Sequence, residues 1–135
     1  MKKMLMIASV FFAVPALAET NADLRAMYEM HEENELAFRK QYGNRELVFD
    51  AVVRSVEADA AMRMSGFNVI EIPGANIDAP GVAEGIFPMA VAMFADEDDL
   101  MPLRRGQRVR LKCTVDFDTI EMVSDLYFKD CVMAQ

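Results

Sequence analysis

The sequence contains no tryptophan and only one histidine, His31, among its 135 residues. A single chain therefore cannot build a metal site from several imidazoles, and a charge-relay triad would have to use His31. The nucleophile and nucleotide motifs GxSxG, SxxK, HExxH and the P-loop are also missing. His31 lies on the apolar face of a predicted helix, where we expect a packed side chain. We predict that the protein is not an enzyme and holds no cofactor and no metal.

Positive charge is scarce. Fourteen Lys and Arg residues stand against 22 Asp and Glu, which gives a net charge of −8 at pH 7. Without the first eighteen residues, which carry two lysines and no acid, the net charge becomes −10. Such a chain as a whole repels nucleic acid and anionic membrane surfaces. We therefore do not expect nucleic acid as a partner.

Residues 1–18 have the pattern of a secretory signal peptide. Two lysines follow Met1, residues 4–14 are apolar with one serine, and a small-x-small sequence ends at Ala18. The apolar run is too short to span a bilayer. No cysteine follows the cleavage site, so no lipid anchor and no membrane span are expected. The interpretation is a soluble periplasmic or secreted protein that begins at Glu19.

Only two cysteines are present, Cys113 and Cys131. Outside the cytoplasm two thiols most simply form one disulfide, and the alternative, a redox or metal pair, lacks a CxxC spacing. Cys113 shares the inward face of its predicted strand, whereas Cys131 is out of phase with Phe128 in a regular strand. A β-bulge near residues 129–130 would restore the phase.

The remaining 117 residues, 19–135, are predicted to be a single domain with an N-terminal helix. Apolar side chains recur at helical spacing over residues 20–41, and Gly43 is a natural end. Thr20 with Asp23 resembles a capping box. We therefore expect one continuous helix over about 20–42.

Strand patterns follow the helix. Residues 57–63 are expected to form a loop or short turn, and residues 73–85 a longer loop rich in Pro and Gly. Residues 96–103 are expected to form a short helix that starts with an acidic turn. The predicted strands are residues 46–56, 66–72, 87–94, 106–117 and 126–133. This order predicts a β-rich α+β fold, a five-stranded OB-fold barrel with a short helix between its third and fourth strands.

Several short motifs occur along the chain. They are Asn34, Glu35, Ala37, Tyr42 and Gly43, then Phe94, Asp96, Glu97 and Asp98, then Leu103, Gly106, Gln107 and Val109, and finally Phe128, Lys129, Asp130 and Cys131. Together these motifs resemble the tRNA_anti-like family, a bacterial group of exported, lipoprotein-like OB-fold proteins. The resemblance implies an OB-fold but no catalytic residue, and the chain departs from the family in lacking a lipobox cysteine and in its longer loop at 73–85.

A basic row on the fourth predicted strand is the clearest candidate site. Arg108, Arg110 and Lys112 alternate with apolar residues and should project from one face. The row could bind an anion, but we favour a solvated outer face balanced by carboxylates, for which Asp50, Asp116 and Asp130 are the candidates. The acidic run at residues 96–99 lacks the ligand spacing of a calcium loop.

The interpretation that these observations favour is an exported OB-fold binding module. Its expected ligand is a protein, a peptide or a cell-envelope component, recognised through a barrel face and the loop at 73–85. One alternative is a periplasmic metal-handling protein that binds Cu(I) through Met62 and Met64, or through Met27, Met30 and His31. Another is a single-stranded nucleic-acid binder.

Overall fold

The structure, a computed structural model, describes residues 19–120 and 124–134. The predicted signal peptide and its cleavage sequence lie outside the described residues. Among the described helices, none is long and apolar enough to cross a membrane.

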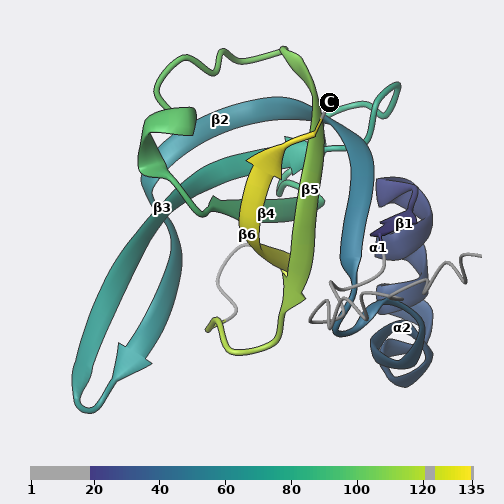
Figure 1. The fold of residues 1–135 in the computed structure, drawn as a ribbon, viewed down its shortest axis with the longest axis horizontal. Helices are drawn as coiled ribbons and strands as arrows, with labels where there is room; N and C mark the ends of the chain where they lie inside the picture. The colour runs from purple at the N-terminus through teal and green to yellow at the C-terminus, as the bar shows by residue number, and fades with distance from the viewer. Residues whose placement is uncertain (1–18, 121–123, 135) are drawn as a thin grey trace, which may run out of the picture.

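The fold is β-rich α+β, with one mixed six-stranded sheet and two helices (Figure 1). In chain order the elements are β1 (Glu19–Asn21), α1 (Leu24–Glu33), α2 (Glu35–Tyr42), β2 (Glu46–Ser65), β3 (Asn68–Asp78), β4 (Ala90–Phe94), the 3-10 turn η1 (Glu97–Asp99), β5 (Arg108–Asp116) and β6 (Tyr127–Met133).

The strand order in the sheet is β1-β2-β3-β4-β6-β5, and β5 also pairs with β2. The pairings therefore pass from β2 through β3, β4, β6 and β5 and return to β2. The β4–β6 and β1–β2 pairs are parallel, and the other pairs are antiparallel. The strand β2 is long and curved (Figure 1), and it pairs with β3 at one end of this series and with β5 at the other.

The helical region differs from the prediction of one continuous helix over about 20–42. Asn34 leaves the helical conformation and separates α1 from α2. Its backbone N–H donates to the Met30 carbonyl at 2.7 Å, and its side-chain oxygen accepts from the Ala37 N–H at 3.0 Å. One asparagine thus ends the first helix and caps the second. The predicted end at Gly43 is confirmed.

The predicted capping box is wrong. Thr20 belongs to β1, a strand that the sequence did not indicate, and pairs with Leu47 in parallel. The N-cap of α1 is Asp23, whose side chain accepts from the Arg25 N–H at 3.0 Å.

The predicted loop at 57–63 is also wrong, because β2 continues through it to Ser65 and pairs with β3. Residues 73–78 belong to β3, so the connection to β4 is shorter than the predicted loop 73–85. The acidic run forms only the three-residue turn η1, capped by the Asp96 side chain, instead of a helix to residue 103. Pro102 limits any longer helix there.

Two apolar clusters bury both faces of β4. Ala90 and Ala92 face the main core, which also contains residues of both helices and the inner faces of β2 and β5. Val91 and Met93 point the opposite way, because side chains alternate along a strand. They pack in a second, smaller cluster with Ala60, Ala61 and Tyr127, against which Ile72 also packs.

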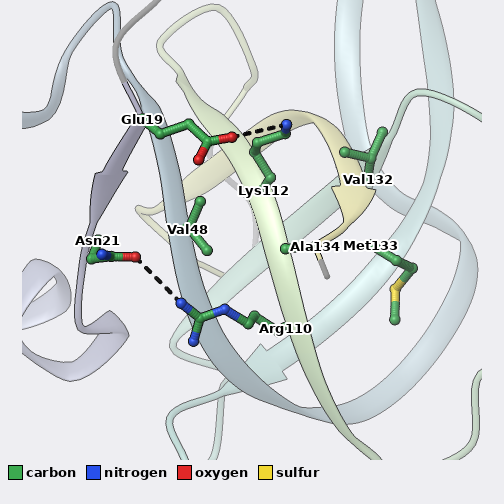
Figure 2. A pocket seen from close by; sticks show the side chains of 8 residues that line it. All are labelled: Glu19, Asn21, Val48, Arg110, Lys112, Val132, Met133 and Ala134. Carbon is green, nitrogen blue, oxygen red and sulfur yellow. Dashed lines mark hydrogen bonds and ion pairs between the residues drawn. The ribbon is translucent and has the colours of Figure 1, made fainter.

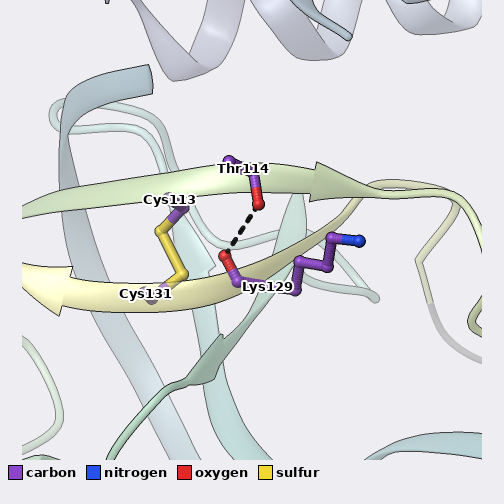
Figure 3. The surroundings of a disulfide bond; sticks show 4 residues. All are labelled: Cys113, Thr114, Lys129 and Cys131. Carbon is purple, nitrogen blue, oxygen red and sulfur yellow. Dashed lines mark hydrogen bonds between the residues drawn. A yellow bond between two sulfur atoms is a disulfide. The ribbon is translucent and has the colours of Figure 1, made fainter. Parts of the chain in front are cut away.

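The predicted disulfide is confirmed between Cys113 and Cys131 (Figure 3). The predicted bulge is confirmed as well: Lys112 pairs with Val132, whereas Thr114 pairs with Lys129, so β6 carries an extra residue there. Asp130 takes a left-handed conformation with φ of 53°, which Asp tolerates better than most residues. The bulge brings the Cys131 side chain to the buried face.

Candidate functional site

The basic row lies on the outer face of β5. Arg108 and Arg110 are exposed and Lys112 is half-buried, as the alternation predicted. Asp50 of β2 pairs with both arginines, at 3.2 Å from Arg108 and 3.4 Å from Arg110. Glu19 of β1 pairs with Lys112 at 3.1 Å. Two carboxylates therefore face three cations.

Of the three carboxylates proposed to balance the row, only Asp50 forms ion pairs with it. Asp116 pairs with Arg63 instead. Glu19 was missed, because the short strand β1 that places it beside β5 has no distinct pattern in the sequence.

A hollow of about 390 Å³ lies beside the basic row (Figure 2). Arg110 and Lys112 form its polar wall, and Val48 and Val132 contribute apolar surface. Both cations already have partners: Lys112 has Glu19, and Arg110 donates to the Asn21 side-chain oxygen at 3.3 Å. An anion entering this hollow would have to compete with these groups.

A second candidate surface is the arm, defined here as residues 61–72 of the β2–β3 hairpin. It projects from the rest of the protein toward the lower left in Figure 1. A register shift between Glu57 and Ala61 separates the arm from the lower part of the hairpin. The arm turns at Gly66 and Phe67, between the paired residues Ser65 and Asn68. Gly66 has φ of 62°, as the first central residue of a type II′ turn requires.

The arm carries exposed apolar side chains. Phe67, at the turn, is fully exposed, and Met64, Val69 and Ile70 are each about half exposed. The β3 edge that faces away from β2 meets β4 only from Ala75 onward. Within the described part of the chain, the edge of residues 68–74 thus has no strand partner.

The base of the arm is tied to the body. The Ile120 N–H donates to the Met62 carbonyl at 3.0 Å, which forms an isolated β-bridge. Arg63 donates to the Asp116 carboxylate at 2.6 Å. These two contacts fix the base of the arm against the rest of the protein, and the tip beyond Arg63 extends from it.

Asp116 is the buried partner in this contact, with a fully buried side chain. Burial raises the pKa of its carboxyl group. Hydrogen bonds from Thr119, from Arg63 and from the Asp118 backbone N–H outweigh that effect and hold the pKa below its ordinary value.

The connection between β3 and β4, which includes most of the predicted recognition loop, is anchored by Arg54. Its guanidinium donates to the backbone carbonyls of Gly85 and Ile86. Asp78 accepts from the Met89 N–H at 3.0 Å and closes the base of the connection. Ile86 remains 90% exposed. This segment is a fixed loop with an exposed apolar residue.

The candidate copper ligands do not form one cluster. Met27 is fully buried in the core, and the His31 ring packs edge-on against Phe38 at 5.0 Å between ring centres. Met62 and Met64 alternate on β2 and share one face of the arm. Among residues 19–120 and 124–134, no three His, Cys, Asp or Glu side chains group in a way that could hold a metal ion.

Comparison with known proteins gives no further assignment: no protein-family model, no curated protein and no solved structure matches this chain.

Proposed function

We propose that the protein is an exported OB-fold binding module that recognises a protein or peptide through its β2–β3 arm. The pairings that return to β2, the parallel β4–β6 pair and the position of η1 between β4 and β5 support the OB-fold assignment. The resemblance to the tRNA_anti-like family supports the same fold. The sequence of residues 1–18 and the Cys113–Cys131 disulfide support export.

The apolar arm is the observation that carries the proposed function. Soluble proteins usually protect a projecting strand edge with lysine, proline or covering segments. Here the tip presents Met64, Phe67, Val69 and Ile70, and Glu71 is its only acid. Exposed apolar side chains beside an unpaired strand edge suit a partner that adds an extended segment to the hairpin.

The position of the arm also fits the proposed fold. OB-folds commonly bind ligands with the face of their second and third strands and with adjoining loops. In this protein those strands would be β3 and β4, and the second cluster around Val91 and Met93 covers their outer face. The arm, with its exposed apolar side chains, therefore remains as a surface that a ligand could contact.

The nucleic-acid alternative has less support. Single-strand binders combine stacking aromatics with a basic groove. Phe67 could stack on a base, but residues 57–72 contain three acids and a single cation, Arg63. Arg63 is committed to Asp116. The basic row on β5 is faced by Asp50 and Glu19.

The metal-handling alternative depends on Met62 and Met64. Thioethers bind Cu(I), and the two side chains lie on one face of the arm. Titration with Cu(I) tests this alternative directly: binding that the Met62→Leu/Met64→Leu variant abolishes would support it.

Capture from an envelope extract tests the main proposal. Wild type, Phe67→Ser/Ile70→Ser and the control Leu36→Ser would be immobilised and compared; Leu36 is exposed on α2. We expect specific partners on wild type and on Leu36→Ser that the arm variant loses. A photoreactive phenylalanine analogue at position 67 should crosslink to the same partners. Equal capture by the arm variant, or no crosslink from position 67, would contradict the proposal.

A further inference from the structure

A separate hollow of about 250 Å³ lies at the root of the β2–β3 hairpin, between β2 and the segment that begins with η1. The buried Leu100 forms its floor, and the exposed Val56 and Met101 contribute its apolar walls. Glu57 of β2 and Glu97 of η1 also line it. The hollow is therefore apolar inside and acidic at its rim.

Further acids adjoin the two lining residues along the chain. Asp59 follows Glu57 on β2, and Asp98 and Asp99 follow Glu97. Among the described ion pairs, none involves any of these five carboxylates. The two acids that line the hollow, Glu57 and Glu97, thus have further acids beside them in the chain and form no ion pair among the described residues.

The contacts around Glu57 and Glu97 leave both carboxylates without a cationic partner among the described ion pairs. Glu57 accepts a hydrogen bond from the Asn76 side-chain nitrogen at 3.0 Å, which fixes the carboxylate in place. Along the chain, Arg54 precedes Glu57 by three residues, and Arg104 and Arg105 follow the η1 acids. Arg54 pairs with Asp78 at 3.9 Å, and Arg105 pairs with Glu84 at 2.9 Å. A partner can therefore supply the missing positive charge.

The size of the hollow indicates the kind of ligand. Small-molecule sites usually enclose roughly 300–1,000 Å³, more than this hollow provides. One large apolar side chain fits the available space better. A bare metal ion is a poor fit, because Glu57 and Glu97 are the only acids that line the hollow, and no three His, Cys, Asp or Glu side chains of the described residues group closely enough to hold a metal.

We propose that this hollow binds a cationic segment of a partner protein. One large apolar side chain of that segment fills the hollow, and its lysine or arginine side chains pair with Glu57 and Glu97. This inference rests on the proposed function as a protein-binding module, and it adds the charge of the partner and a second contact point beside the arm.

Fluorescence anisotropy with a defined probe tests the inference. The probe is a short fluorescein-labelled peptide with a central leucine flanked by lysines. Two control peptides replace the leucine by serine or the lysines by glutamates. The protein variants are Glu57→Gln/Glu97→Gln and, as a control with the same change in net charge, Glu32→Gln/Glu33→Gln on α1.

We expect saturable binding of the lysine–leucine peptide that weakens about tenfold in the rim variant and weakens further with added salt. The α1 control variant should bind as wild type does, and both control peptides should bind poorly. Equal loss in the two variants, or equal binding of the serine peptide, would show that net charge alone attracts the probe and would overturn the inference.

The two proposals can fail separately. Undetectable binding of the lysine–leucine peptide, together with envelope partners that still depend on Phe67, would overturn the hollow as a cationic-peptide site and leave the arm as a binding surface. Peptide binding that depends on Glu57 and Glu97 without any partner captured through Phe67 would support the hollow and contradict the arm.

Discussion

The guanidinium group of Arg63 lies 2.6 Å from the carboxylate of Asp116, so the projecting β2–β3 arm is tied to the end of β5. Asp116 is fully buried at its side chain, whereas Arg63 is 38% exposed. Thr119 and the Asp118 backbone N–H also donate to Asp116. The carboxylate thus joins the arm to the β5–β6 connection.

This contact predicts a pH dependence of stability. Because the pKa of Asp116 is lower in the folded state than in the unfolded state, the unfolded chain binds more protons as the pH falls. The contribution is complete above the unfolded pKa of about 4 and is lost as the pH falls through the lower folded value. We expect Asp116→Asn to cost about 1–2 kcal/mol near pH 7, limited by the partial exposure of Arg63, and much less at low pH.

Urea unfolding between pH 2 and pH 7 checks this prediction, with the exposed Asp59→Asn as the control. The difference between wild type and Asp116→Asn should shrink on acidification, while the difference for Asp59→Asn should stay near zero. A constant difference at every pH would show that the charge of Asp116 does not contribute.

The disulfide is expected to stabilise the sheet where β5 and β6 meet. It closes a loop with a sequence separation of 18, for which the chain-entropy treatment gives about 3 kcal/mol. Denaturant unfolding with and without reductant measures this loss, and the Cys113→Ala/Cys131→Ala variant should match the reduced protein. Native protein with two alkylatable thiols would contradict the bridge.

The close approach of β3 and β4 predicts sensitivity at Gly74. A Cβ atom there would lie 2.7 Å from the Ala92 carbonyl oxygen and 3.2 Å from the Ala60 Cβ. Since neither the backbone nor the packed Ala60 can move freely, Gly74→Ala should destabilise the fold by about 1–3 kcal/mol.

Gly85→Ala is the matched control for this prediction. A Cβ atom at Gly85 would meet only the Phe87 carbonyl oxygen, at 3.7 Å, so we expect a change within about 0.5 kcal/mol. Thermal unfolding of both variants makes the comparison. Equal stability of the Gly74 and Gly85 variants would show that β3 and β4 tolerate a wider separation.

Regular alternation made part of the fold predictable. The predicted strand at 106–117 contains β5, because its apolar and charged residues alternate without interruption. The disulfide followed from the presence of only two cysteines in a chain predicted to be exported, and the bulge followed from the mismatched phases of Cys113 and Cys131. The strand and the bulge were predictable because each depends on the spacing of residues within a single strand.

The predicted strand at 66–72 lies largely in β3, but the continuation of β2 into the arm was missed, because its pattern is not that of a half-buried strand. Glu57 and Asp59 suggested a loop, although β2 accommodates them beside a register shift. The tip leaves apolar residues exposed, so alternation between core and solvent is lost. The break at Asn34 was missed for a related reason: one polar residue on a helical stripe looks like an imperfection until its two capping hydrogen bonds are known.

The basic row is expected to contribute little to the stability of the fold. Asp50 and Glu19 pair with the three cations of the row, and every side chain in these pairs is at least 34% exposed. Replacing the three cations by serine should therefore leave the fold intact and cost at most about 1 kcal/mol for each ion pair. Circular dichroism and urea unfolding test the effect on the fold.

Anion binding gives the sharper test of the same surface. If Asp50 and Glu19 are what neutralises the row, Glu19→Gln/Asp50→Asn should bind a single-stranded oligonucleotide at low salt more tightly than wild type does, with affinity that falls as salt is added. The control Glu32→Gln/Glu33→Gln changes the net charge equally without touching the row. Micromolar binding by wild type near physiological salt, lost in the triple serine variant, would instead make this row a nucleic-acid site and contradict our assignment of it as a balanced outer face.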